Sequence, residues 1–383
     1  MKKFKNTLPF ILIFLFLANC GEKKTDHSAD NSHSGLNKKK VPESSKKPPV
    51  SISSDKCSGN TCTVDHISED ILNYTNKISN KSRFIIVFGK KASNTDLKTI
   101  KKIPWIETVY IYGSSITDLS PLKNLSHLKT LKIRNIKSVS KLNLRTLSNH
   151  KTLNFLDLHY LNDSIAFIDS LGTLENLKKL ILWNVTVPDV SWLSSLSSLK
   201  ELTLNKTSSR KLSYVSKLKS LEKLVLMKLD SFNLNDVSHL KLLSEITLED
   251  ITEELQNIKY LAKSENLKTL SIAGCTAKNL SDIKLLKNIK VLRLNRMVLN
   301  KVDFISDLSK LEVLDLSGSS ITSLENMSYL KNLRILNTGL LENIDISLIA
   351  SMKSLKSVTF SRKFSDKNIS ILQKLRRDLK IWK

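Results

Sequence analysis

The chain has 383 residues and a formal net charge of +25 at pH 7, because 61 Lys and Arg residues outnumber 36 Asp and Glu residues. Such a charge can indicate nucleic-acid binding, but 51 of the 61 cations are Lys and no nucleic-acid-binding motif occurs, so we expect no nucleic-acid partner. The sequence also lacks a Gly-rich phosphate loop, H-E-x-x-H and G-x-S-x-G, and it therefore supports neither an enzyme nor a cofactor or metal site.

Residues 1–19 are predicted to be a lipoprotein signal peptide. The basic segment MKKFK precedes an apolar stretch, 8–18, that is shorter than the roughly 20 residues of a membrane-spanning helix. The following L-A-N-C resembles the lipobox of bacterial lipoproteins, and this resemblance implies that Cys20 is diacylated and becomes the mature N-terminus. Asn19 departs from the Gly, Ala or Ser that is usual before the cysteine. An ordinary secretory signal cleaved nearby remains the alternative.

Residues 20–62 are predicted to be a disordered tether between the lipid and the folded domain. The segment is rich in Lys, Ser and Pro and has almost no large apolar residue, so it cannot bury a core. Near its end, Cys57 and Cys62 bracket an SGNT turn, and we expect them to form a disulfide in an oxidising envelope. Cys275 is expected to be a small buried core residue.

Residues 63–105 are predicted to form an N-terminal cap. Residues 66–79 carry apolar side chains at helical spacing, and a short strand is expected at 83–88. Together they would cover the open end of a stack of repeats, since such a stack needs a closing layer at each end. Residues 376–383 are expected to close the other end.

Residues 106–375 contain an L-x-x-L-x-L pattern that returns twelve times, at intervals of 22 to 25 residues. The copies start at Ile106, Leu128, Leu153, Leu177, Leu199, Leu221, Leu243, Leu267, Ile289, Leu311, Leu333 and Leu355. So constant a period indicates a repeat protein. We number the first residue of each copy as slot one.

Each copy is predicted to be one coil, with a strand on one side and a short helical segment on the other. In the copy that starts at Leu311, the apolar slots four and six, Leu314 and Leu316, alternate with other residues at the period of a strand. Apolar residues then recur every third position, a spacing that fits 3₁₀ turns better than a long α-helix. No copy can bury its own apolar edge, so we expect the coils to stack into a solenoid with a concave parallel sheet.

The repeat resembles a known family. Residues 116–133, ITDLSPLKNLSHLKTLKI, are similar to the 22-residue repeats of bacterial internalin-like leucine-rich repeat proteins. The resemblance implies a horseshoe-type leucine-rich repeat solenoid, mostly β with short 3₁₀ segments, and a role in binding other proteins that includes adhesion to a host. The matching residues are the buried ones, so they do not name a ligand.

Two features depart from that family. Slot nine, which often holds an asparagine that satisfies the backbone at the bend, holds apolar or small residues here, so backbone hydrogen bonds or water must replace the amide. In the copy that starts at Leu333, Thr338 stands where a buried Leu is expected and Gly339 follows it. We predict a local bulge there.

Slots three, five and seven face out of the predicted concave sheet, and in the first copies they are rich in aromatic and basic residues. The candidate ligand-binding residues are Tyr110, Tyr112, Arg134, Phe155, His159, Trp183 and Met227. The same slots also hold Lys132, Asp157 and Lys179. Aromatic side chains with Arg and Met on a rigid sheet are typical of the hot spots of protein interfaces. The alternative is that the rings stack on one another or lie under the N-terminal cap.

The leading hypothesis is a lipid-anchored protein of a bacterial cell envelope, at the outer membrane or cell surface, that binds a protein through its concave sheet. Two alternatives remain open: an interaction protein that stays inside the envelope, and a binder of anionic glycans through its lysines. Two further surface features are weaker binding candidates. They are the acidic group Glu245, Glu249, Asp250, Glu253 and Glu254, and the apolar row Val291, Val313 and Ile335 in slot three.

Replacing Cys20 with Ser is expected to release the protein from membranes, because the predicted lipid anchor requires a thiol at that position. Metabolic labelling with a fatty-acid analogue, followed by membrane fractionation, measures both the modification and its consequence. Labelling that persists in Cys20→Ser would contradict the lipobox.

Overall fold

The computed structural model describes residues 56–78, 84–161, 165, 167–207, 212–299 and 301–383. All of them belong to one structural unit. The predicted signal peptide, Cys20 and the tether up to residue 55 lie outside the described residues. Within the described ranges, no helix combines the length and the apolar character needed to cross a membrane.

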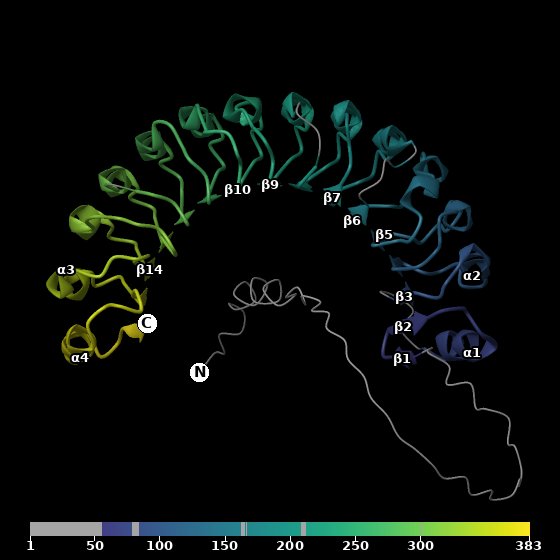
Figure 1. The fold of residues 1–383 in the computed structure, drawn as a ribbon, viewed down its shortest axis with the longest axis horizontal. Coiled ribbons are helices and arrows are strands. Elements are labelled where there is room, and N and C mark those ends of the chain that lie inside the picture. Colours follow the sequence, from purple (N-terminus) through teal and green to yellow (C-terminus); the bar gives the residue numbers. More distant parts are fainter. Residues whose placement is uncertain (1–55, 79–83, 162–164, 166, 208–211, 300) are drawn as a thin grey trace, which may run out of the picture. The chain divides into compact units, whose positions relative to one another are not determined.

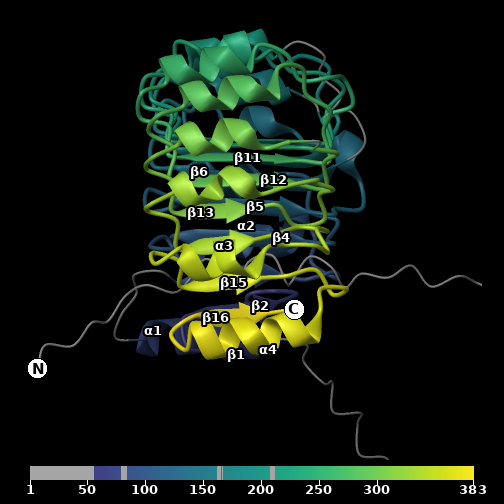
Figure 2. The same ribbon diagram turned by 90° about the vertical axis from the view of Figure 1, so that its left-hand side faces the viewer.

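The described strands form one sheet whose order follows the chain (Figures 1 and 2). β1 pairs antiparallel with β2, and every later neighbour pairs in parallel. The strands are β1 (Lys56–Ser58), β2 (Thr61–Val64), β3 (Ile85–Phe88), β4 (Thr108–Tyr112), β5 (Thr130–Arg134), β6 (Phe155–Leu161), β7 (Lys179–Val185), β8 (Glu201–Asn205), β9 (Lys223–Met227), β10 (Glu245–Glu249), β11 (Thr269–Ala273), β12 (Val291–Asn295), β13 (Val313–Asp315), β14 (Ile335–Asn337), β15 (Ser357–Thr359) and β16 (Lys380–Trp382).

Short helical segments follow the strands and lie on the outer side of the arc whose inner side the sheet lines (Figure 1). The 3₁₀ segments are η1 (Thr99–Lys102), η2 (Ser120–Leu122), η3 (Val139–Lys141), η4 (Leu144–Leu147), η5 (Ile168–Thr173), η6 (Ser191–Ser195), η7 (Ser213–Lys217), η8 (Leu234–Val237), η9 (Ile258–Lys263), η10 (Leu280–Leu285), η11 (Asp303–Asp307) and η12 (Glu325–Tyr329). The α-helices are α1 (Glu69–Lys77), α2 (Asn94–Lys98), α3 (Ile346–Ser351) and α4 (Asp366–Leu375). The predicted solenoid, with its concave parallel sheet and 3₁₀ turns, is confirmed.

The core is a stack of leucine rows shared between coils. In slot four, Leu224, Ile246, Leu270 and Leu292 lie opposite one another on β9 to β12, and all four are fully buried. Each row is covered on both sides by its neighbours, so every interior coil depends on the next for the burial of its apolar edge. The repeat period thereby fixes the register, because a slip of one residue would turn these side chains to the solvent.

The bend after each strand is made by a residue with left-handed backbone geometry. The ten slot-eight residues from β4 to β13 have positive φ: Gly113, Asn135, Tyr160, Asn184, Lys206, Lys228, Asp250, Gly274, Arg296 and Gly318. Backbone hydrogen bonds to the next coil satisfy the bend, as when Lys206 N donates to Met227 O over 2.9 Å. In slot nine, Ser319 Oγ accepts from Met297 N and donates to Leu294 O, and so takes the place of the usual asparagine amide.

In the copy that starts at Leu333 the turn comes one residue early. Gly339, in slot seven, adopts φ 66°, and Thr338 before it is fully buried. A side chain on Gly339 would collide with the backbone oxygens of Leu316 and Ser319, so only glycine fits there. The predicted irregularity is therefore a turn that comes one residue early.

Both ends of the solenoid extend further than the sequence suggested. Residues 56–62, predicted to belong to the tether, form the β1–β2 hairpin, in which a disulfide joins Cys57 and Cys62. Cys62 and Val64 alternate as buried residues of β2, a strand period that the polar composition of the segment concealed. The predicted cap 63–105 consists of two coils built on β2 and β3, with α1 and α2 on their outer side.

The C-terminal layer also starts before residue 376. Helix α4, which was predicted to be part of the repeats, is the outer element of the last coil, and β16 continues the parallel sheet from β15. Leu372 of α4 is fully buried, whereas Ile371 and Leu375 are exposed, so only one face of the helix covers the stack.

Replacing Leu224 or Leu292 with Ala is expected to lower the unfolding free energy by about 2–5 kcal/mol, because each side chain is fully buried and its loss leaves a cavity. Leu375→Ala is the matched control and should lower it far less, since Leu375 is 59% exposed at the end of α4. Denaturant unfolding of the three variants measures this. Equal losses would contradict a stack that buries its interior coils more completely than its terminal layer.

Candidate binding face of the concave sheet

Strands β4 to β7 bring the aromatic and basic candidates into one cluster on the inner side of the arc. We call this cluster the cationic–aromatic patch; it consists of Tyr110, Tyr112, Lys132, Arg134, Phe155, Asp157, His159, Lys179 and Trp183. The parallel register aligns Tyr110, Lys132 and Asp157 in slot five. It aligns Tyr112, Arg134, His159 and Trp183 in slot seven. Residues 22 to 25 positions apart in the sequence thus become lateral neighbours, about 4.8 Å from strand to strand.

Asp157 is the buried centre of the patch. The sequence placed it among outward-facing residues, but the structure leaves its side chain only 1% exposed. Its carboxylate lies 2.6 Å from Arg134 Nη2 and 2.6 Å from His159 Nε2. Burial raises the pKa of Asp157, but the contacts with His159 and Arg134 lower it by more, so the carboxyl titrates below its usual range. A buried carboxylate of this kind holds the side chains of Arg134 and His159 in place.

Ring contacts extend outward from that centre. The Arg134 guanidinium lies 5.5 Å above the ring of Tyr110, and the rings of Tyr110 and Tyr112 are 6.1 Å apart. On the other side, the rings of His159 and Trp183 stack at 5.6 Å with an interplanar angle of 8°. Part of the aromatic surface is therefore used within the patch, as the alternative reading expected, while Tyr112 remains 39% exposed.

Phe155 has an ammonium group on either neighbouring strand. Lys132 Nζ lies 5.4 Å and Lys179 Nζ 5.3 Å from the centroid of its ring. Such cation–π contacts hold long lysine side chains close to an aromatic face. Lys179 also lies 2.6 Å from the carboxylate of Glu201 on β8, in the same slot of the next coil.

Met227 lies outside the patch. Asn205, on β8, separates it in register from Trp183 in slot seven. Asn205 was not among the predicted site residues, because slot seven suggested an exposed surface position. Its side chain is nonetheless buried, and its Nδ2 has no hydrogen-bond partner among the described residues. An unpaired buried amide destabilises a fold by about 1–3 kcal/mol.

Many lysines that flank the sheet pair with carboxylates of the adjacent coil. The ammonium of Lys129 lies 2.8 Å from Glu107, and those of Lys200 and Lys290 each lie 2.6 Å from a glutamate in slot two of the next coil. Surface pairs of this kind stabilise by only about 0–1 kcal/mol. They nonetheless occupy these lysines within the molecule, which makes them poorer ligands for an external anionic glycan.

The two weaker binding candidates, the apolar row in slot three and the acidic group, offer fewer kinds of contact to a partner. Val291, Val313 and Ile335 form the predicted row in register, but they offer only a narrow aliphatic strip. In the acidic group, Glu249 and Asp250 both bind Arg296 Nη2, at 2.8 and 3.1 Å.

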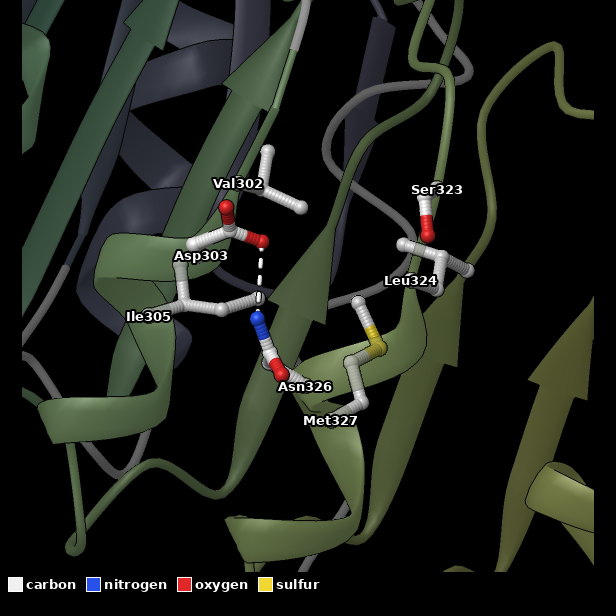
Figure 3. Close-up of a pocket in the computed structure, with 7 residues that line it drawn as sticks. All are labelled: Val302, Asp303, Ile305, Ser323, Leu324, Asn326 and Met327. Carbon is white, nitrogen blue, oxygen red and sulfur yellow. Dashed lines mark hydrogen bonds between the residues drawn. The ribbon is translucent and has the colours of Figure 1, made fainter.

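A groove on the outer side, between η11 and η12, leaves no room for a water molecule (Figure 3). Its rim is closed by Asn326 Nδ2, which donates to Asp303 Oδ1. Among the described residues, no three His, Cys, Asp or Glu side chains are placed to hold a metal ion. The cationic–aromatic patch, by contrast, offers ring faces and hydrogen-bond donors to a partner.

Comparison with solved structures of other proteins also supports the leucine-rich repeat fold. No protein-family profile and no curated protein sequence matches the chain. Among solved structures, an internalin from Listeria monocytogenes superposes with a TM-score of 0.57 and 22% identity, over 74% of this chain and 82% of the internalin. A leucine-rich repeat protein of Leptospira interrogans superposes with a TM-score of 0.56 and 18% identity, over 83% of this chain and 93% of that protein. The chain has the fold of internalin-like leucine-rich repeat proteins.

At these identities the likeness concerns the leucine-rich repeat solenoid itself and carries no information on ligands. The sequence resemblance in residues 116–133 and the structural comparison agree because both depend on the buried rows. The side chains of the patch face away from those rows, so they have to be interpreted from their own contacts.

Asp157→Asn is expected to lower the unfolding free energy by about 1–3 kcal/mol at neutral pH, because Arg134 and His159 lose a charged partner. The lowered pKa of Asp157 means that its contribution is present above about pH 4 and is lost as the pH falls through the folded-state value. Urea unfolding of wild type and variant from about pH 7 to about pH 3 measures the difference, which should shrink toward the acid end.

The control is Asp315→Asn, which changes a half-buried carboxylate in the same slot of β13. A difference between wild type and Asp157→Asn that stays constant across this range would show that the carboxylate is not the stabilising group.

Proposed function

We propose that this protein is a lipid-anchored component of a bacterial cell envelope that binds another protein through the concave sheet of its leucine-rich repeats. The observation that carries the proposal is the cationic–aromatic patch, a continuous set of aromatic and basic side chains on four neighbouring strands of a rigid sheet. Tyr, Trp and Arg are the side chains enriched in hot spots of protein interfaces. Adhesion to a host surface is the form of binding that the resemblance to internalins suggests.

Preorganisation of the patch supports a binding role. Arg134 and His159 are fixed by Asp157, and Trp183 is fixed by stacking on His159. Side chains that are already ordered lose little conformational entropy when a partner binds, so more of the contact free energy appears as affinity. The concave parallel sheet supplies a surface on which several such side chains can meet one partner together.

The anchor is proposed from residues 1–20, whose basic, apolar and lipobox-like order suits export and acylation at Cys20. With a tether after Cys20, the solenoid would be held near the membrane while its concave face remains accessible. Protease treatment of intact cells tests whether that face is outside the cell. Cleavage of the solenoid on intact cells supports the surface location, and protection until the outer membrane is opened supports the alternative inside the envelope.

Trp183→Ala is expected to weaken capture of a protein partner by about tenfold or more, since truncating an interface hot spot removes about 2 kcal/mol or more of binding free energy. The melting temperature should change little, because Trp183 lies outside the leucine rows. Affinity capture from surface proteins, followed by calorimetric titration with the captured protein, measures this.

Tyr329→Ala is the matched control, because Tyr329 is an aromatic residue that is 65% exposed on the outer side, in η12. Binding that survives Trp183→Ala but is lost in the control would move the interface to the outer side. Binding to heparin alone, with no protein captured, would favour the anionic-glycan alternative.

A further inference from the structure

The charge that the cationic–aromatic patch presents to a partner is positive. Lys132, Arg134 and Lys179 contribute three cations. The carboxylate of Asp157 is 1% exposed and offsets the charge of Arg134, with which it forms an ion pair. Glu201 offsets Lys179 at the edge of the patch. An anion that approaches β5 therefore meets Lys132, which is the cation of the patch that no carboxylate of the described residues neutralises.

Lys132 is the cation with the most capacity left for an external partner. No carboxylate lies within 4.0 Å of its ammonium among the described residues, and its contact within the fold is the ring of Phe155. In slot five its lateral neighbours are Tyr110 and Asp157, and the Asp157 carboxylate is occupied by Arg134 and His159. A cation held over an aromatic ring stays close to the sheet and can still accept a second, anionic partner.

A second observation points the same way and does not depend on charge. Two buried donors in slot seven, Arg134 Nε on β5 and Asn205 Nδ2 on β8, have no acceptor among the described residues, whereas His159 Nε2 between them has the Asp157 carboxylate 2.6 Å away. Asn205 is 3% exposed. The two donors lie three strands apart, about 14 Å at the strand spacing of a sheet. His159 and Trp183 occupy the same slot on the two strands between them. The Asn205 amide in particular has no oxygen acceptor within the patch.

The sheet has the opposite charge further along. On β10 and its following bend, Glu249 and Asp250 share a single cation, Arg296, and Glu253 and Glu254 are exposed. A basic partner segment would be attracted to β10 and repelled at β5, and an acidic segment would experience the reverse. Complementary charge of this kind sets the position of a partner on a surface and raises its association rate.

We infer that the partner protein presents an acidic segment to the cationic–aromatic patch, with carboxylates at Lys132 and Arg134 and an apolar side chain against Trp183. This inference rests on the proposed function and names the partner's chemistry at the same face. Backbone or carboxylate oxygens of that segment satisfy the Asn205 amide. A polyanionic glycan would match the charge, and the heparin arm of the test below distinguishes it from a protein segment.

The test measures binding of the purified full chain to three immobilised synthetic peptides that alternate Phe with Glu, Gln or Lys. Heparin fragments form a fourth probe. We expect the Glu peptide to bind about tenfold or more tightly than the Gln peptide, with an affinity that falls as salt rises, and the Lys peptide not to bind. Preference for the Lys peptide, equal binding of all three, binding of heparin only, or no binding would overturn the inference.

Two variants link that binding to the patch. Lys132→Gln should remove most of the preference for Glu over Gln, whereas Arg293→Gln, which changes a cation in the same slot of β12, should leave it intact. Asn205→Leu removes the unpaired donor but keeps an apolar body of similar size. It should weaken binding of the Glu peptide while the melting temperature stays equal or rises. A fall in melting temperature with unchanged binding would make Asn205 structural only.

Failure of the inference can be told apart from failure of the proposed function. If capture of a protein depends on Trp183 but is insensitive to Lys132→Gln and to salt, the concave face binds a protein and the inference of an acidic segment is wrong. If neither Trp183→Ala nor Lys132→Gln changes any binding, the concave face is not the interface and both proposals fail.

Discussion

Burial between neighbouring coils is the interaction on which the rest of this structure depends. A coil of 22 residues has two apolar slots in its strand and a few in its outer arc, and it cannot cover them itself. Leu224 and Leu292 are fully buried only because a coil lies on each side. The turn in slot eight follows from the same constraint, because each strand must end at the same height for the rows to meet. Left-handed geometry at ten successive bends, even at Tyr160 and Arg296, shows that stacking outweighs the local cost of positive φ.

Stacking leaves most outward slots of the sheet with little part in folding, and Asp157 is the clearest exception. Most concave residues can vary because the leucine rows lie on the other face of the sheet. Asp157 differs, since a buried carboxylate has to be neutralised by Arg134 and His159 for the solenoid to tolerate it. Binding and stability are therefore linked at this position, and loss of the carboxylate would disorder the patch as well as weaken the fold. This linkage between stability and patch geometry is expected where long polar side chains are ordered before a partner binds.

The period and alternation in the sequence predict the coil, the parallel sheet and the 3₁₀ arc, because these depend on residues within one repeat. The burial of Asp157 and Asn205 does not follow from slot position, since it depends on what the lateral neighbours do. For Asp157 a signal was present, an arginine 23 residues earlier and a histidine two residues later, which parallel stacking brings together. For Asn205 no comparable signal exists. The polar composition of residues 56–62 predicts disorder, and only two alternating buried residues, Cys62 and Val64, indicate the strand of the hairpin.

Slot position and the residue in the same slot of the adjacent coil together decide what a lysine does in this molecule. In slots two and three, Lys129, Lys179 and Lys290 meet a glutamate of the adjacent coil and become part of a ladder along the stack. Lys132, in slot five, meets tyrosine on one side and on the other an aspartate that is already occupied. The same residue type thus stabilises the stack in one column and remains available in another. A high net charge spread over such columns says little by itself, and the unpaired cations carry more information about a partner than the paired ones.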